Sequence, residues 1–490
     1  MAVTNPRFDL GAAVPSWEDL GAVHLVAIGG AGMSAVARLL LARGVAVSGS
    51  DAADSPVLEQ LRSAGARVWL GHDAAHLEGV DTVVVSSAVR DDNPELAAAR
   101  ARGLRVLHRS QALAAVTTGT RVVAVAGANG KTTTTSMLAV ALTAAGADPS
   151  FASGGEVAQL GTNAALGRGE AFVVEADESD GSFVVYRPEV AVVTNVQPDH
   201  LDFHGTAEAV DAAYREFAAT VRRGGLLVAC ADDPGSRALA DAVRASGGRV
   251  LTYSAVPGAG EGADLRVTES TPEGLGTRSR VALPDGTEHE LLLAVPGGHN
   301  VANACAALLT AVTGLGEPVA AVLEGLAGFR GARRRFEVRG EVGGVTVVDD
   351  YAHNPAKVAA VVGTAADIVR RSGRGRLRVV FQPHLYSRTR DFADAFAAAL
   401  APADHVVLLD VYGAREDPVP GVTSALVGEP LAALPGDRRV AGGVDPATAV
   451  ELPAGEGAPG DPRVTAGAGD VTRLGPLILD ALRRRPEEDR

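Results

Sequence analysis

The stretch Arg121–Ala144, RVVAVAGANGKTTTTSMLAVALTA, decides the fold of the middle of this chain. It opens with an apolar run, turns at GANG and continues as a helical pattern, which is typical of a strand, phosphate loop and helix in an α/β sheet. Backbone N–H groups at such a helix start can cradle phosphates. Lys131 would then neutralise phosphate charge, and the hydroxyl of Thr132 or Thr133 would bind Mg²⁺.

This loop is shorter than the common GxxxxGK[ST] pattern, because Val125 stands where the first glycine would be. A glycine-rich turn with an exposed lysine is therefore the alternative to a nucleotide site. Lysine is scarce, however, since Lys131 and Lys357 are the only two among 45 basic residues. A mechanism that needs a phosphate-loop lysine depends on Lys131.

Length and composition exclude several classes of protein. The 490 residues, 47% hydrophobic and 21% charged, predict a globular chain of about three domains. The net charge of −14 argues against nucleic-acid partners. No apolar run approaches the roughly 18 residues that span a bilayer, so we expect a cytoplasmic protein without a membrane partner. Cys230 and Cys305 lie in apolar surroundings and are expected to be buried thiols.

Short apolar runs alternate with helical stretches in three blocks, at 1–115, 116–328 and 329–490. We therefore predict an α/β fold of three domains, each built on a mainly parallel sheet. The first and third domains are expected to be Rossmann-like and the central one a P-loop-type ATPase domain. Strand-like pieces within 255–290 predict antiparallel additions to the central domain, and 452–462 is expected to be a loop.

The first βα turn of the chain, GGAGMS at Gly29–Ser34, resembles a dinucleotide fingerprint. Asp51 ends the second strand, 21 residues after Gly30, and Ala35 replaces the third glycine of the fingerprint. NAD, another diphosphate and a purely structural turn are all compatible with this loop.

Acidic and histidine side chains gather where two strands of the central block end. The first group is Glu175, Asp177, Glu178 and Asp180, and the second is Asn195, Asp199, His200, Asp202 and His204. Ligands bind at this edge of an open α/β sheet, and hard oxygen ligands suit Mg²⁺. A solvated acidic loop is the alternative for the first group.

Later motifs offer amide, histidine and arginine side chains. Asn300 and Asn303 share one helix face and match the hydrogen-bonding edge of adenine, although Asn300 could instead cap the helix. DDYAHNP ends another strand with acids and a histidine. FQPHLYSRTRD offers His384 and Arg388, and an arginine there suits recognition of a carboxylate.

Taken in order, these segments resemble the Mur ligase family over about residues 22–482. The motifs are AIGGAGMS, SSAVRDDNPEL, GANGKTTTT, EADESDGSF, TNVQPDHLD, GGHNVANACAA, RRRFEVRG, DDYAHNP, FQPHLYSRT and GAGDV. The resemblance implies an ATP-dependent ligase of peptidoglycan precursor synthesis that joins L-alanine to the lactyl carboxylate of UDP-N-acetylmuramate through an acyl phosphate. Mg²⁺, or Mn²⁺ in its place, would assist. A recycling ligase that adds a preformed tripeptide to the same UDP-sugar is the alternative within the family.

The resemblance also implies a role for each matching residue. The implied catalytic set is Lys131, Glu175, His200 and Arg335, with Thr132, Glu175 and His200 as metal ligands. The implied ATP-binding set is Gly127, Asn129, Gly130, Lys131, Thr132, Thr133, Asn300, Asn303, Arg335 and Asp350. The implied UDP-sugar set is Gly29, Gly30, Gly32, Met33, Ser34, Asp51, Ser86 and Ser87. The implied amino-acid set is Tyr351, His384 and Arg388.

By the same resemblance, residues 1–115 would hold the UDP-sugar, 116–328 would hold ATP, and 329–490 would close over the amino acid and nucleotide. The implied partners are UDP-N-acetylmuramate, L-alanine and ATP, and the expected state is a monomer or weak homodimer. Three positions depart from the family pattern: Asn129 and Asn354 stand where histidines are usual, and Leu385 replaces a frequent arginine. The last departure leaves Arg388 as the expected carboxylate partner.

Overall fold

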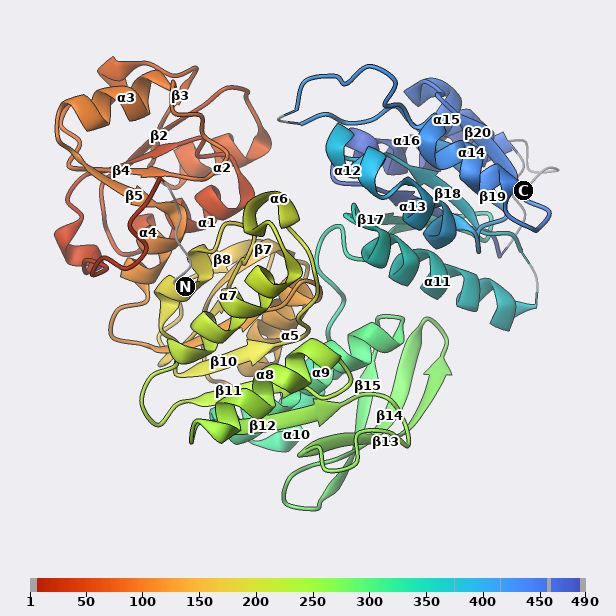
Figure 1. Ribbon diagram of the computed structural model, residues 1–490, viewed down its shortest axis with the longest axis horizontal. Coiled ribbons are helices and arrows are strands. Elements are labelled where there is room, and N and C mark those ends of the chain that lie inside the picture. Colours follow the sequence, from red (N-terminus) through yellow and green to blue (C-terminus); the bar gives the residue numbers. More distant parts are fainter. Residues whose placement is uncertain (1–6, 374, 415, 456–459, 485–490) are drawn as a thin grey trace. The chain divides into compact units, whose positions relative to one another are not determined.

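The computed structural model describes residues 7–373, 375–414, 416–455 and 460–484 (Figure 1). The chain forms two compact units. The first comprises residues 1–294 with 298–330, and the second comprises 295–297 with 331–490. The first unit contains two sheets and the second contains one.

The first sheet has five parallel strands in the order β3-β2-β1-β4-β5. The strands are β1 (Val23–Val26), β2 (Val47–Asp51), β3 (Arg67–Leu70), β4 (Thr82–Val85) and β5 (Arg105–His108). The α-helices among them are α1 (Ala31–Ala42), α2 (Pro56–Ser63), α3 (Pro94–Ala101) and α4 (Arg109–Val116). Strands β1 and β4 are buried along their whole length, as the continuous apolar runs of a doubly wound sheet require.

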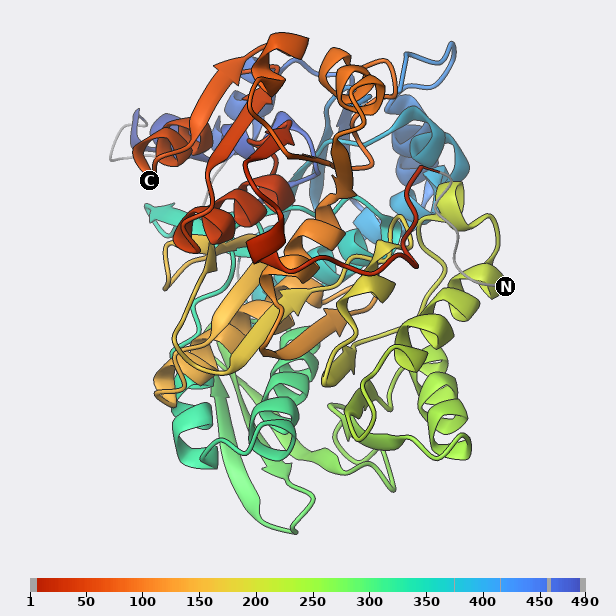
Figure 2. The ribbon, with the colours of Figure 1, turned by 90° about the vertical axis from the view of Figure 1, so that its left-hand side faces the viewer.

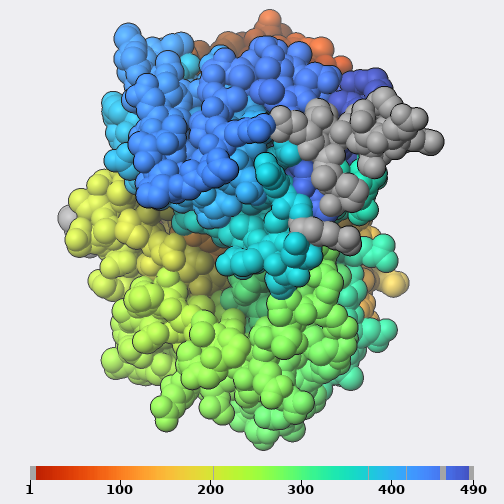
Figure 3. Space-filling view, turned by 90° about the vertical axis from the view of Figure 1, so that its right-hand side faces the viewer, coloured from red at the N-terminus to blue at the C-terminus, as the bar shows by residue number. Residues whose placement is uncertain are grey.

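The central sheet has ten strands in the order β15-β14-β13-β12-β11-β10-β6-β9-β7-β8. They are β6 (Arg121–Ala126), β7 (Ser150–Val157), β8 (Thr162–Ala165), β9 (Ala171–Glu175), β10 (Val190–Val193), β11 (Leu226–Cys230), β12 (Arg249–Ser254), β13 (Leu265–Glu273), β14 (Gly276–Ala282) and β15 (Glu288–Leu293). Pairing is antiparallel between β7 and β8 and along β13-β14-β15, so the expected antiparallel additions are confirmed. Residues of β13–β15 form the green lower surface in Figure 3.

The α-helices of this part of the chain are α5 (Lys131–Ala144), α6 (Leu201–His204), α7 (Ala207–Ala219), α8 (Pro234–Ala245), α9 (Gly298–Leu309) and α10 (Val319–Ala327). The short 3₁₀ helix η3 covers Ser182–Tyr186. The N-terminal segment, dark red in Figure 2, passes between the orange first sheet and the yellow elements of the central sheet. Phe8 and Leu10 of this segment are buried in a core that both sheets share.

The third sheet has six strands in the order β16-β17-β21-β18-β19-β20, and only β16 is antiparallel. The strands are β16 (Glu337–Val342), β17 (Val345–Asp350), β18 (Arg378–Phe381), β19 (His405–Leu408), β20 (Arg439–Gly442) and β21 (Pro462–Ala466). The helices are α11 (Pro355–Ser372), α12 (Tyr386–Asp391), α13 (Ala393–Leu400), α14 (Ala425–Ala433), α15 (Pro446–Gly455) and α16 (Leu474–Arg484). The loop expected at 452–462 is wrong for 452–455, which complete α15, and for 462, which begins β21, while 456–459 lie outside the described residues.

Three mainly parallel sheets confirm the predicted fold class, and both cysteines are buried free thiols as expected. The predicted boundaries at 115/116 and 328/329 stay predictions. No helix in the described part of the chain is long and apolar enough to cross a membrane.

Strand register brings the functional loops of the central sheet together. Val125 of β6 pairs with Glu175 of β9, and Ala126 of β6 pairs with Val193 of β10. All three strands are parallel, so the loops that follow them leave the same edge of the sheet side by side. The phosphate loop and both acidic strand ends therefore share one site.

Candidate functional site

The phosphate loop joins β6 to α5, and two of its positions accept only glycine. Gly127 has φ +139° and Gly130 has φ +87°, a region that L side chains rarely adopt. A Cβ at Gly127 would collide with the Thr194 hydroxyl, and one at Gly130 would lie 2.5 Å from Asn303 Oδ1. The loop therefore leaves its backbone N–H groups close to the start of α5, where an anion is favoured.

The residues that follow β10 fix the conformation of this loop. The Thr194 hydroxyl donates to the Asn129 carbonyl at 2.6 Å, and the Asn195 amide both accepts from the Asn129 N–H at 2.9 Å and donates to its carbonyl at 3.0 Å. These contacts use the Asn129 backbone, so the loop geometry does not depend on the histidine usual at this position. Thr194 was not among the predicted residues, although its place at a strand end beside the loop was a usable signal.

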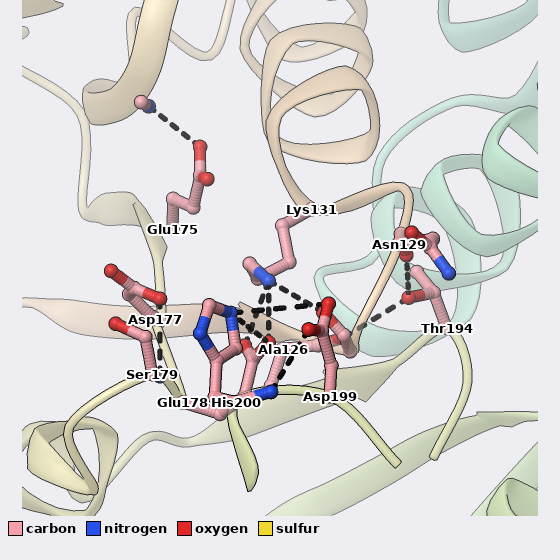
Figure 4. Close-up of polar contacts among 12 residues, drawn as sticks. Ala126, Asn129, Lys131, Glu175, Asp177, Glu178, Ser179, Thr194, Asp199 and His200 are labelled. Atoms are coloured by element: carbon pink, nitrogen blue, oxygen red, sulfur yellow. Dashed lines mark hydrogen bonds and ion pairs between the residues drawn. The ribbon is translucent and has the colours of Figure 1, made fainter. Parts of the chain in front are cut away.

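Lys131 points from the first turn of α5 into the acidic loop after β9 (Figure 4). Its Nζ donates to the Gly127 carbonyl at 2.7 Å and lies 2.7 Å from one oxygen of Glu178 and 2.9 Å from the other. The Glu178 side chain is 2% exposed. Burial disfavours the charged ammonium, but the carboxylates around it, Glu178 first among them, together outweigh burial and raise the pKa of Lys131. Lys131 is therefore a permanent positive charge at the loop, rather than the exposed lysine of the alternative interpretation.

Two predicted metal ligands are in direct contact. The Thr132 hydroxyl donates to Glu175 Oε1 at 3.0 Å, and the Gly154 N–H donates to Glu175 Oε2 at 2.6 Å. The third predicted ligand, His200, lies on the Glu178 side, with Nε2 3.8 Å from Glu178 Oε1. His200 has φ +52° and ψ +40°, a strained conformation for a non-glycine residue and one that clusters at functional sites.

This donor set fits a magnesium ion. Hydroxyl and carboxylate oxygens are the ligands Mg²⁺ prefers, and the ion keeps several waters and binds substrate phosphates as well. Among the described residues, no group of three or more His, Cys, Asp and Glu side chains is arranged to hold a metal alone. An ion that shares its ligands with water and phosphate needs no such group.

Asn300 and Asn303 are buried on α9 beside the phosphate loop. Asn303 Oδ1 accepts from the Thr134 hydroxyl at 3.2 Å, and its amide nitrogen donates to Asn300 Oδ1 at 3.3 Å. Asn300 is the third residue of α9 rather than the residue before the helix, so the capping alternative is not supported. In this structure the pair positions α5, and the adenine contact stays a prediction.

The glycine turn of the first sheet is held by the acid that ends β2. Asp51 Oδ2 accepts from the Gly29 N–H at 2.9 Å. A Cβ at Gly30 would have no neighbour nearer than 3.5 Å, whereas one at Gly32 would collide with the Arg109 guanidinium. A Cβ at Gly30 would therefore make only ordinary contacts, and this glycine lies at the start of α1, where a diphosphate could approach the backbone.

The other residues predicted to bind the UDP-sugar divide into two kinds. Met33 and Ser34 are buried within α1, and the Ser34 hydroxyl donates to the Ala31 carbonyl at 3.0 Å. Ser86 and Ser87 follow β4, with Ser86 partly exposed and Ser87 exposed. The UDP-sugar contact of the two serines stays a prediction, whereas Met33 and Ser34 shape the helix beneath the turn.

In the second unit, two arginines stack on Tyr351. The Arg334 and Arg335 guanidinium groups lie 4.8 Å and 5.2 Å from the ring centroid. Asp350 accepts from the Phe336 N–H at 2.7 Å. Burial raises the pKa of Asp350 to about 6, against the opposing charge of Arg335. The predicted pair Arg335 and Asp350 therefore lie close enough to interact.

The three residues predicted for the amino acid lie around a fourth, His353. Its ring centroid is 4.9 Å from that of Tyr351 and 5.8 Å from that of His384, and its carbonyl accepts from Arg388 Nη1 at 3.4 Å. Burial, followed by the cations Lys357 and Arg388, lowers the pKa of His353 well below its usual value. A neutral His353 was not singled out from the sequence, although it is the histidine of the DDYAHNP motif.

The structure shows the local roles of Asn354 and Leu385, the other two positions that depart from the family pattern. Asn354 caps α11, because its side chain accepts from the Lys357 N–H at 2.9 Å. Leu385 is buried and has φ +68°, so this position turns the chain into α12. Glu416 fixes the same turn by accepting from the Ser387 N–H at 2.9 Å.

Comparison with known proteins decides the family. The chain matches the Mur ligase family catalytic domain over residues 22–121, the Mur ligase middle domain over 125–311, and the Mur ligase glutamate ligase domain over 334–469. The UDP-N-acetylmuramate–L-alanine ligase of Kineococcus radiotolerans is 57% identical over 485 residues, covering 97% of this chain and 99% of that protein. The chain belongs to the Mur ligase family.

Solved Mur ligases share the architecture of this one. The UDP-N-acetylmuramate-alanine ligase of Thermotoga maritima has a TM-score of 0.78 at 28% identity, covering 94% of this chain and 99% of that chain. A murein peptide ligase of Psychrobacter arcticus has a TM-score of 0.69 at 25% identity, covering 95% and 99%. The family resemblance predicted for this Mur ligase from its motifs is confirmed.

Proposed function

We propose that this Mur ligase joins L-alanine to the lactyl carboxylate of UDP-N-acetylmuramate, with ATP converted to ADP and phosphate. The observation that carries the proposal is the 57% identity, over nearly the whole of both chains, to a protein named for that activity. The murein peptide ligase of Psychrobacter arcticus has a fold similar to that of this chain, but the sequence identity between the two is 25%. The comparisons therefore favour L-alanine over a preformed tripeptide.

The reaction needs a site that stabilises a transferring phosphoryl group. A carboxylate oxygen of the UDP-sugar attacks the γ-phosphorus and ADP leaves, giving an acyl phosphate. The amine of L-alanine then attacks the acyl carbon, phosphate leaves, and an amide forms. Lys131, held as a cation in the phosphate loop, supports the first step because it lies where phosphate charge must be neutralised.

Thr132 and Glu175 are the residues proposed to hold Mg²⁺, with His200 beside them. When bound, the ion would neutralise phosphate charge and orient the γ-phosphate. Arg335 and Asp350 are proposed for the nucleotide, and Tyr351, His384 and Arg388 for the amino acid. The guanidinium of Arg388 suits the L-alanine carboxylate because it can bind both oxygens at once.

We assign a different substrate to each of the three predicted domains. Residues 1–115 bind the UDP-sugar, 116–328 bind ATP, and 329–490 bind the amino acid and close over the nucleotide. The substrates are soluble metabolites, so we place the reaction in the cytoplasm, with the enzyme acting as a monomer or weak homodimer.

A phosphate-release assay with a panel of substrates tests the proposal. With ATP, Mg²⁺ and UDP-N-acetylmuramate, we expect L-alanine to stimulate phosphate release and amide formation one for one. Stimulation by the tripeptide L-alanyl-γ-D-glutamyl-meso-diaminopimelate and not by L-alanine would move the assignment to a recycling ligase. No stimulation by any amino acid or peptide would remove the ligase assignment.

A further inference from the structure

Two contacts join the acidic loop after β9 to residues of the first sheet and its connecting segments. The Arg109 guanidinium lies 3.3 Å from Asp177 Oδ2. Three residues further on, Asp180 Oδ2 accepts from the Ser87 hydroxyl at 2.5 Å and lies 3.2 Å from His108 Nε2. Between these two contacts along the loop, Glu178 forms the ion pair with Lys131. The contacts of the first sheet therefore set the position of the loop that faces the phosphate site.

His108 is fixed from every side. Its backbone N–H donates to the Gln111 side chain at 3.0 Å, and its Nδ1 accepts from the Ser110 N–H at 3.3 Å, so the residue caps α4. Phe8 of the N-terminal segment packs on the ring, with centroids 4.9 Å apart. Because Nδ1 is an acceptor, the ring proton is on Nε2, which is the nitrogen that faces Asp180.

Asp180 is a buried carboxylate that depends on these partners. Burial favours its protonated form, but His108, Ser182 and Ser87 together outweigh burial and hold the pKa of Asp180 below its usual value. Its other oxygen accepts from the Ser182 N–H at 3.0 Å, which ties it to the start of η3. Asp180 is therefore charged, rigidly placed and bonded across two sheets.

Ser87 links this contact to the site proposed for the UDP-sugar. Its backbone carbonyl accepts from Arg7 Nη1 at 3.0 Å, so the N-terminal segment holds the backbone of a residue that is exposed as a whole. A hydroxyl has one hydrogen to donate, and in this structure Asp180 takes it. A phosphate oxygen that bound the Ser87 hydroxyl would take that hydrogen, leaving His108 as the donor that keeps Asp180 in place.

We propose that His108 and Asp180 are positioning residues that couple binding of the UDP-sugar diphosphate at Ser87 to the acidic loop that faces Lys131. The inference rests on the proposed function, because it requires a UDP-sugar on the first sheet. Each ligand then changes the affinity of the other by the same factor, as linkage requires.

Calorimetry on the full chain tests this coupling. The affinity for UDP-N-acetylmuramate is measured alone and with Mg²⁺ and the β,γ-imido analogue of ATP, and the ratio of the two constants is the coupling factor. We expect a factor of about fivefold or more in the parent. His108→Asn retains a side chain suited to capping α4 but is too short to reach Asp180, so we expect its factor to fall to within about twofold of one.

Asp180→Asn is the second variant, and the double variant should lose no more coupling than either single change, because both residues belong to one contact. A merely structural role would weaken UDP-sugar binding equally with and without the nucleotide analogue and leave the coupling factor unchanged. The matched control is Asp148→Asn, which removes the exposed pair with Arg168 elsewhere on the central sheet and should leave the factor unchanged.

The outcomes distinguish a failure of this inference from a failure of the proposed ligase function. A parent that binds the UDP-sugar with a factor near one, or variants that keep the parental factor, would overturn the coupling and leave the ligase assignment standing. A parent that does not bind UDP-N-acetylmuramate at all would overturn the proposed function itself.

Discussion

The buried pair Lys131–Glu178 predicts that removing the phosphate-loop lysine damages stability as well as turnover. Lys131→Met leaves the Glu178 carboxylate, 2% exposed, without its partner at 2.7 Å. Breaking a buried ion pair by removing one member costs about 3–5 kcal/mol. For a unit of more than 300 residues, an unfolding entropy of about 2.1 cal/mol/K per residue means that 1 kcal/mol shifts the melting temperature by about 1.5 °C, so we expect a loss of roughly 4–8 °C.

The double variant Lys131→Met/Glu178→Gln separates the two effects. Replacing both charges by uncharged groups of similar size is often close to neutral, so stability should return to near the parental value. Turnover should not return, because no cation is left to stabilise the transferring phosphoryl group, and we expect a loss of about 10²–10⁴-fold in both variants.

The assay combines thermal unfolding with steady-state phosphate release. The matched control is Arg121→Met, which removes the partly exposed pair with Glu189 at the opposite end of β6 and should cost no more than about 1 kcal/mol. If Lys131→Met has the same melting temperature as the parent, the Lys131–Glu178 pair does not stabilise the fold as its geometry requires. If the double variant turns over near the parental rate, the phosphate-loop assignment is wrong.

Three further predictions address the other sites. Gly30→Val should fold and weaken binding of UDP-N-acetylmuramate more than of ATP, whereas Gly32→Val should also lower the melting temperature, because it displaces Arg109; equal effects in calorimetry would contradict the difference. The pKa of Asp350 is about 6 in the folded chain and near 3.8 in the unfolded chain, so protonation favours the folded state, and stability should fall by about 2 kcal/mol as pH rises from 4 to 6. Asp350→Asn should lack that fall in pH-dependent melts. Arg388→Lys should raise the KM for L-alanine with a smaller effect on ATP, and initial rates with an unchanged L-alanine KM would remove Arg388 from the site.

Sequence patterns identified the elements that depend on local apolar runs and glycine turns. The turn before Lys131 and the acidic end of β9 were both found this way, because strand ends in a parallel sheet have recognisable neighbours. Edge strands were harder to find. β7 (SFASGGEV) and β20 (RVAG) have few large apolar residues, since a strand at or near an edge buries less surface.

Partnerships between distant residues could not be predicted from spacing. Lys131 and Glu178 are 47 positions apart, and Ser87 and Asp180 are 93 apart. Which acid of the cluster pairs with which cation is set by the packing of β6, β9 and the first sheet, not by a local pattern. The strained backbone of His200 was equally invisible, because its φ reflects tertiary contacts rather than the preference of histidine.

The most direct test of the ligase account follows an oxygen atom from the carboxylate to phosphate. UDP-N-acetylmuramate labelled with ¹⁸O in both oxygens of the lactyl carboxylate is incubated with the enzyme, ATP, Mg²⁺ and L-alanine, and the released phosphate is analysed by mass spectrometry. If the carboxylate is activated as an acyl phosphate, each phosphate carries one ¹⁸O for every amide formed. Amide formation with unlabelled phosphate, or phosphate release without any amide, would contradict the account.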